Sequence, residues 1–179
     1  MSVGIDPKYL QAKIYLYPSA SSAREGVSVG GSGFILGVMS PDNSLICRYA
    51  VTNKHVIDGG CRVIRTNTPD GSLRIVETPA EAWTCALDDD LAIAELDGPA
   101  AGCIVMDEVF LEEDCKIDDW PIFPGDEVLL YGRLVTHDGQ QRNRPVVRFG
   151  NISMLPDSDS PVKVGEREQI AFLVECRSL

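Results

Sequence analysis

The stretch Ala50-Val51-Thr52-Asn53-Lys54-His55-Val56-Ile57-Asp58 places one of the two histidines of this 179-residue chain where an apolar strand breaks into a turn. A side chain at the end of a strand is held rigidly and faces the loops that carry binding and catalytic groups. Imidazole is also the side chain used most often for proton transfer near neutral pH. A lone histidine in such a place is more often a partly buried structural residue, so His55 needs support from its surroundings.

That support comes 35 residues later (90 − 55), where three aspartates precede the apolar run Leu91-Ala92-Ile93-Ala94. Asp88 and Asp89 read as a solvated turn that discourages edge pairing of strands. Asp90 stands directly against the apolar run, at the mouth of a second strand, where its carboxylate could accept an imidazole N–H. Such a partner fixes the tautomer of a histidine base and stabilises its charged form.

The segment Val29-Gly30-Gly31-Ser32-Gly33-Phe34 imitates the glycine-flanked serine of a protease nucleophile. Ser32 lies 23 residues before His55 (55 − 32), on what we expect to be a strand that opens the first barrel. We expect the glycines to allow close backbone packing beside a cleft. We therefore predict that Ser32 is not a nucleophile.

Three segments in order carry a family resemblance: Gly31–Ile35 (GSGFI), Val51–Val56 (VTNKHV) and Asp90–Ile93 (DLAI). They resemble the trypsin-like (chymotrypsin-fold) serine proteases, most closely the bacterial branch that includes the HtrA proteases. The resemblance implies that His55 is general base and acid and that Asp90 orients it. In the second half, Phe123–Gly132 resembles the family strand that opens the C-terminal barrel, and Val147–Ser153 resembles the next one.

One departure from the family bears on mechanism. After the aspartate, these enzymes carry a G-x-S-G-x-P segment that supplies the attacking serine and the oxyanion hole, and this sequence contains none. Residues 171–179 resemble the strand and loop that lead to that segment, so we expect the serine beyond Leu179. Ser178 lacks the flanking glycine of an exposed nucleophile, and Cys176, at the end of an apolar strand, reads as a structural thiol.

Short apolar segments separated by turn residues predict an antiparallel all-β fold. The family resemblance implies a two-barrel, trypsin-like architecture, with a complete N-terminal and a partial C-terminal barrel. We expect the N-terminal barrel over residues 1–98, an acidic connection over 99–123 and the partial barrel over 124–179. Helix should be minor, with one turn after His55. The expected strands are Ala12–Tyr17, Gly33–Met39, Leu45–Thr52, Arg62–Thr66, Leu73–Thr78, Leu91–Leu96, Glu127–Val135, Pro145–Phe149 and Gln169–Cys176.

Composition excludes several function classes. A net charge of −11 opposes binding to nucleic acid. The longest apolar runs are too short to cross a membrane, and no secretory signal opens the chain, so we expect a cytoplasmic protein. The six cysteines form no CxxC pair and read as reduced, mostly structural thiols, and their spacing from His55 matches no zinc pattern. We expect no metal and no cofactor; His137, in a loop with hairpin-turn chemistry, reads as an exposed turn residue.

The sequence thus predicts a serine endopeptidase that cleaves protein or peptide substrates, with the 179 residues alone inactive. Because an incomplete barrel leaves open strand edges and apolar faces, we expect a completing C-terminal segment or a partner protein. The alternative is a catalytically inactive trypsin-like fold that acts as a protein-binding or regulatory module, in which His55 and Asp90 remain as a hydrogen-bonded pair.

Overall fold

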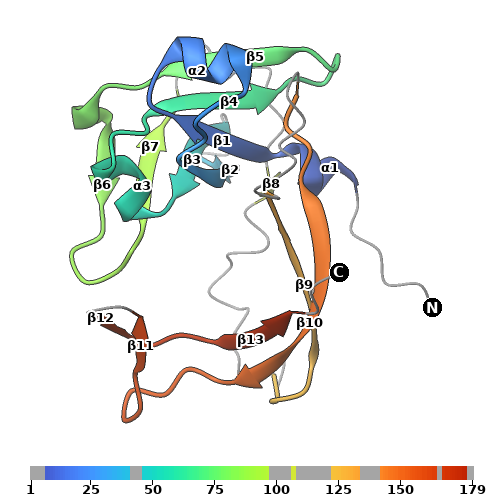
Figure 1. Ribbon diagram of the computed structural model, residues 1–179, viewed down its shortest axis with the longest axis vertical. Coiled ribbons are helices and arrows are strands. Elements are labelled where there is room, and N and C mark those ends of the chain that lie inside the picture. Colours follow the sequence, from blue (N-terminus) through green and yellow to red (C-terminus); the bar gives the residue numbers. More distant parts are fainter. Residues whose placement is uncertain are drawn as a thin grey trace. The chain divides into compact units, whose positions relative to one another are not determined.

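The structure is a computed structural model that describes residues 7–40, 46–96, 106–107, 122–133, 142–164 and 167–176 (Figure 1). Its helices are α1 (Pro7–Gln11), α2 (Ala20–Glu25), α3 (Lys54–Asp58) and the 3-10 turn η1 (Ala80–Ala82). Its strands are β1 (Lys13–Tyr17), β2 (Gly31–Met39), β3 (Ile46–Thr52), β4 (Val63–Asn67), β5 (Leu73–Glu77), β6 (Trp83–Cys85), β7 (Ala92–Glu95), β8 (Met106–Asp107), β9 (Glu127–Gly132), β10 (Val146–Met154), β11 (Val162–Val164), β12 (Arg167–Gln169) and β13 (Leu173–Cys176). The predicted all-β class is confirmed.

The chain divides into two compact units. The first comprises Met1–Phe110 with Gly132–Pro145, and the second comprises Leu111–Tyr131 with Val146–Leu179. This division cuts the chain differently from the predicted segments 1–98, 99–123 and 124–179, which stay a prediction. Except for residues 106–107 and 122–123, the predicted acidic connection lies outside the described residues.

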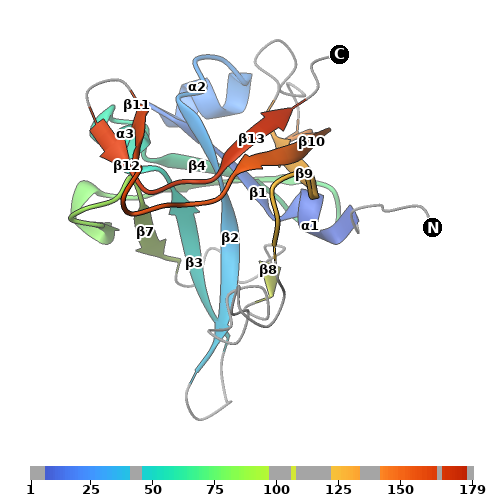
Figure 2. The ribbon, with the colours of Figure 1, turned by 90° about the horizontal axis from the view of Figure 1, so that it is seen from below.

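The first unit is built on one curled sheet with the strand order β5-β4-β1-β2-β3-β7-β6, and β8 pairs in parallel with β2. All neighbours along the main path are antiparallel, and β2 and β3 run side by side from Phe34↔Val51 to Met39↔Ile46 (Figure 2). The sequence of β1, Lys-Ile-Tyr-Leu-Tyr, explains its central place, because apolar or aromatic side chains point to both faces. Ile14 and Leu16 enter one core cluster while Tyr15 and Tyr17 enter a second.

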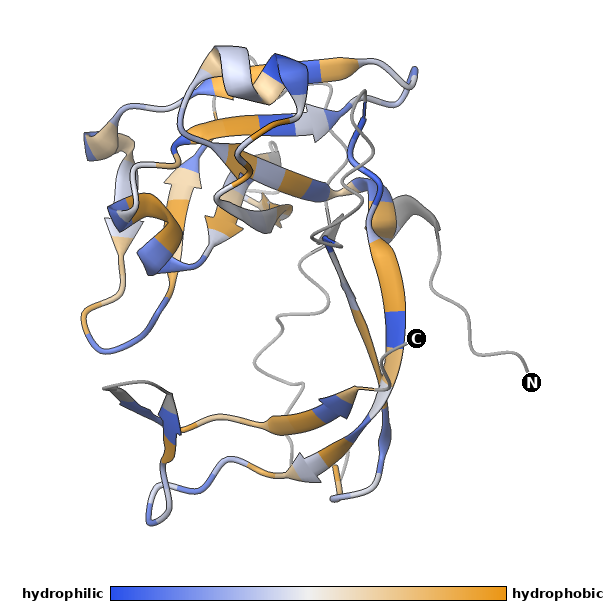
Figure 3. Ribbon diagram, viewed as in Figure 1, coloured by the Kyte–Doolittle hydropathy of each residue, from blue (hydrophilic) through white to orange (hydrophobic). Residues whose placement is uncertain are grey.

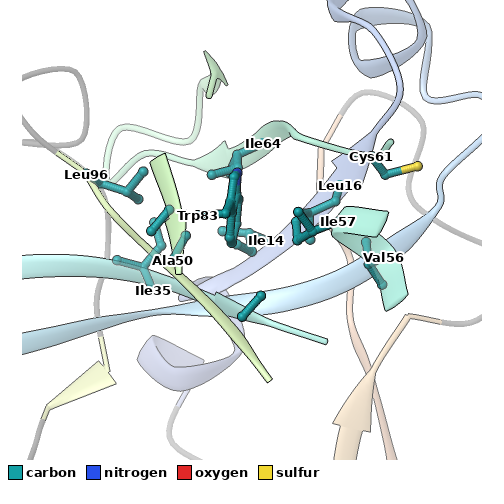
Figure 4. Close-up of a cluster of buried hydrophobic side chains, with 12 residues drawn as sticks. Ile14, Leu16, Ile35, Ala50, Val56, Ile57, Cys61, Ile64, Trp83 and Leu96 are labelled. Atoms are coloured by element: carbon teal, nitrogen blue, oxygen red, sulfur yellow. The ribbon is translucent and has the colours of Figure 1, made fainter. Parts of the chain in front are cut away.

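The larger core cluster ties the sheet to helix α3 (Figure 4). Strand residues Ile14, Ile35 and Ile64 are fully buried, and Trp83 from β6 is 7% exposed. Val56 and Ile57, from α3, belong to the same cluster. Each large apolar side chain buried in this way contributes about 1.5–3 kcal/mol, so the helix that carries His55 is anchored by packing.

Two helices correct the expectation that only the region after His55 is helical. α1 precedes β1, and α2 lies between β1 and β2. In α2 the Ser19 side chain caps the first turn by accepting from Ser22 N at 3.1 Å, and Gly26 ends the helix at φ 72°. Six residues are too few to display a 3.6-residue apolar period, which is why the apolar pattern did not predict α2.

The second unit contains a three-stranded sheet in the order β13-β10-β9 and the hairpin β11-β12. Here two expected strands change: the one predicted over Pro145–Phe149 continues to Met154, and the one predicted over Gln169–Cys176 is interrupted between β12 and β13. The strand expected over Glu127–Val135 ends at Gly132 within the described residues. Over the parts of the chain that the structure describes, no helix is long and apolar enough to span a membrane.

Candidate active site

His55 lies in the first turn of α3, three residues after β3 ends at Thr52. Asp90 lies in the loop between β6 and β7, two residues before β7 begins at Ala92. The antiparallel register pairs Thr52 with Ala92, so the end of β3 and the start of β7 meet at the same edge of the sheet. The topology therefore brings together two residues that are 35 positions apart in sequence (90 − 55).

The two side chains form a close pair. His55 Nδ1 lies 2.6 Å from Asp90 Oδ2, and the other carboxylate oxygen, Oδ1, accepts the backbone N–H of His55 at 2.9 Å. An ionised carboxylate has no hydrogen to donate, so the proton of this bond belongs to Nδ1. The ring nitrogen Nε2 is then left as an acceptor, which is the state of a general base.

The electrostatics of the pair favour an ionised Asp90. Its partial burial would raise the pKa of the carboxyl, but hydrogen bonds from the backbone and ring of His55, the charge of His55 and a bond from Asn53 together lower that pKa below its ordinary value. The His55 side chain is 65% exposed and that of Asp90 is 20% exposed. The ring is therefore open to a reactant while the carboxylate is partly shielded.

Two neighbours that sequence reasoning missed also hold Asp90. Asn53 Nδ2 donates to the Asp90 carbonyl at 3.1 Å and to its Oδ2 at 3.3 Å. Lys54 donates its backbone N–H to the same carbonyl at 3.3 Å and its Nζ to the carbonyl of Ala86 at 3.2 Å. The one available signal was their position directly before His55.

The glycine-flanked Ser32 lies on β2, opposite Tyr15 of β1. Its carbonyl accepts a bond from Thr52 Oγ1 at 3.1 Å, which ties β2 to the last residue of β3. A Cβ at Gly31 would collide with the Val56 side chain, and one at Gly33 would collide with the Val51 carbonyl oxygen. The prediction that these glycines allow close packing is confirmed. Across the described chain no serine side chain bonds to the His55 ring.

The remaining candidates divide between described and undescribed residues. Cys176 is half-buried on β13, where it pairs with Gly150 of β10. Cys47, Cys61, Cys85 and Cys176 are free thiols, whereas Cys103 and Cys115 lie outside the described residues, as do His137 and Ser178. Burial raises the pKa of the Cys61 thiol. The described residues contain no group of three or more His, Cys, Asp or Glu that could hold a metal ion.

Comparison with known proteins gives a structural match. No family model and no curated protein sequence matches the chain. Among the solved structures that match is the crystal structure of the MamO protease domain from Magnetospirillum magneticum in its apo form. The alignment covers 90% of this chain and 69% of that one, with a TM-score of 0.55 and 17% sequence identity. At this identity the likeness shows the fold, which is all-β and trypsin-like.

Proposed function

We propose that this protein is a trypsin-like serine endopeptidase that hydrolyses peptide bonds of protein substrates. The observation that carries the proposal is the 2.6 Å contact between His55 Nδ1 and Asp90 Oδ2 at an exposed ring. In this role His55 takes the proton of the attacking serine and later returns it to the leaving amine, while Asp90 holds the tautomer and stabilises the imidazolium. The sequence motifs support placement in the HtrA-like branch.

The serine and the oxyanion hole belong, in this proposal, to a segment after Leu179 or to a partner protein. The sequence contains no G-x-S-G-x-P segment. A completing segment would also cover part of the second unit, where several apolar side chains are exposed. Phe149 is 60% exposed, Ile170 63% and Phe172 41%. We further propose that the protein acts in the cytoplasm.

The test first reads the codons after Leu179 and then expresses the full-length gene product. This protein is treated with a fluorophosphonate probe, which labels reactive serines covalently. We expect labelling of wild type and loss of at least about 100-fold in labelling rate for His55→Ala, because general-base catalysis contributes about 10²–10⁴-fold. His137→Ala is the matched control, since it removes the other histidine of the chain. Absence of labelling, or equal labelling of His55→Ala, contradicts the enzyme proposal.

A second candidate function is a catalytically inactive trypsin-like fold that binds proteins. Exposed apolar side chains on β13 favour it, Leu173 at 40% and Val174 at 42%, because apolar surface left exposed to water is available for contact with a partner. The labelling experiment separates the two functions: the binding module predicts no reaction with the probe at any protein concentration. It also predicts that His55 and Asp90 remain paired in the unreactive protein.

A further inference from the structure

The start of helix α3 departs from the usual capping pattern. Asn53 is the N-cap residue, at φ −79° and ψ 143°, but its side chain makes no capping hydrogen bond. An N-cap side chain ordinarily accepts the backbone N–H of the second or third helical residue. The second helical residue is His55, and its N–H donates instead to Asp90 Oδ1. The carboxylate from the β6–β7 loop therefore fills the place that the Asn53 side chain leaves.

The side chain of Asn53 forms hydrogen bonds with Asp90 instead. Its Nδ2 donates both to the carbonyl, at 3.1 Å, and to the carboxylate oxygen Oδ2, at 3.3 Å. One amide thus bridges the main chain and the side chain of the same residue. Such a bridge restricts rotation of the carboxylate about its own side-chain bonds, and Oδ2 is the oxygen that the His55 ring contacts.

The loop supplies little packing that could orient Asp90 without hydrogen bonds. None of residues 86–91 is buried, and Leu87 is 93% exposed. Figure 3 colours one part of this loop between β6 and β7 as hydrophilic and another part as hydrophobic. The loop is closed at its base by a bond from Ala86 N to the Leu91 carbonyl at 2.9 Å. Hydrogen bonds, more than van der Waals packing, therefore decide where the carboxylate points.

We propose that Asn53 is a positioning residue of this site. Its side chain does not cap helix α3, where Asp90 accepts the His55 N–H instead, and it orients the Asp90 carboxylate toward the His55 ring. Its catalytic meaning rests on the proposed function. The orientation itself is a property of the folded protein and is measurable whether or not the protein hydrolyses peptides. The two proposals can therefore fail separately.

The informative variant is Asn53→Ser. Serine is about as good an N-cap as asparagine, so the substitution keeps the helix start, but its short hydroxyl removes the amide that bridges Asp90. The readout is the tautomer of the neutral His55 ring, obtained from the nitrogen-15 shifts of histidine-labelled full-length protein. His137, the other histidine, is the internal reference. Lys54 and Asp89 remain in every variant, so their charges contribute equally.

We expect Asn53→Ser to lower the ratio of the Nδ1–H to the Nε2–H tautomer of His55 about fivefold, as the loss of one hydrogen bond implies. Asp90→Ala sets the limit of full loss. Asn151→Ser is the matched control, because Asn151 Nδ2 also donates to a backbone carbonyl, that of Gly125, at 2.9 Å, and it should leave the ratio unchanged. An unchanged ratio in Asn53→Ser, with a drop in Asp90→Ala, overturns the proposal.

If the protein labels with the fluorophosphonate probe, a kinetic readout is added. A positioning residue acts on the chemical step, so Asn53→Ser should lower the maximal rate of labelling about fivefold, with the probe concentration that gives half of this rate unchanged. A fall in thermal stability without change in either the tautomer ratio or the maximal labelling rate would assign Asn53 a purely structural role. Should Asn53→Ser fail to fold, Asn53→Thr, which also keeps an N-cap hydroxyl and lacks the amide, gives the same test.

Discussion

The His55–Asp90 pair shows how the local surroundings of a residue set its protonation. Asp90 receives bonds from the backbone and the ring of His55 and from Asn53, and the pKa of its carboxyl is lowered from 3.8 despite partial burial. These donors all favour the ionised carboxylate over the protonated one. The ring of His55 is thereby supplied with a fixed acceptor, which the sequence motifs predicted, whereas the Asn53 amide was not predicted.

A prediction at this scale concerns the pH dependence of stability. A carboxyl whose pKa is lower in the folded than in the unfolded state adds stability that is present above its unfolded pKa and is lost as pH falls through its folded pKa. Wild type should therefore have a larger free energy of unfolding than Asp90→Asn. This difference should be largest at neutral pH and should shrink below about pH 4.

Urea unfolding at a series of pH values between about 7 and 3 measures this difference. Asp88→Asn is the control, because it removes an equal charge from the same exposed loop without removing a bond to His55. A difference between wild type and Asp90→Asn that stays constant, or grows, as pH falls is incompatible with a lowered pKa of Asp90.

Among the elements, strands were far easier to predict than helices. Strands β1, β2, β3, β4, β5 and β7 coincide with expected strands to within two residues, because alternation and turn residues mark them locally. The short α2 and the three-residue β6 carry no period that so few residues could reveal. Their positions depend on caps and on pairing: β6 exists as a strand because Trp83, Thr84 and Cys85 pair with β7.

The contact between β2 and β3 provides a prediction at the scale of the element. Gly33 lies where a side chain would meet the Val51 carbonyl oxygen and, at 3.1 Å, the Thr52 Cβ, which are groups held by the sheet. Gly33→Ala must therefore displace backbone, and we expect it to lower the free energy of unfolding by about 3 kcal/mol.

Thermal or urea unfolding measures this cost, and Gly132→Ala is the matched control. Gly132 is also a strand glycine, but a Cβ there would meet nothing within 4 Å, so its cost should be within about 0.5 kcal/mol of zero. Equal costs for the two substitutions would show that close approach of β2 to β3 is not what the Gly33 position requires.

In the whole molecule, the two units are interleaved along the chain. Gly132–Pro145 belongs to the first unit, although the residues on both of its sides belong to the second. Asn143 lies in this segment and is 2% exposed. Its side chain donates to backbone carbonyls of β1 and β4. No local sequence pattern could predict these contacts, because Arg65 and Asn143 are 78 positions apart (143 − 65). In the sequence, Gln-Arg-Asn-Arg reads as an ordinary polar turn.

The last prediction is that Asn143 is a major determinant of the stability of the first unit. Its Oδ1 accepts from Arg65 Nε at 2.9 Å, and its Nδ2 donates to the carbonyls of Arg65 at 2.7 Å and Lys13 at 3.1 Å. Arg65 is fully buried, with its guanidinium 4.9 Å from the centre of the Tyr17 ring. Asn143→Ala in the full chain should therefore lower the free energy of unfolding by about 3 kcal/mol, because buried polar groups lose their partners. Hydrogen exchange should accelerate most in β1 and β4.

The control is Asn151→Ala, which removes one exposed bond to Gly125 and should cost less than about 1 kcal/mol. If the two substitutions cost the same, the bonds of Asn143 to β1 and β4 do not stabilise the first unit.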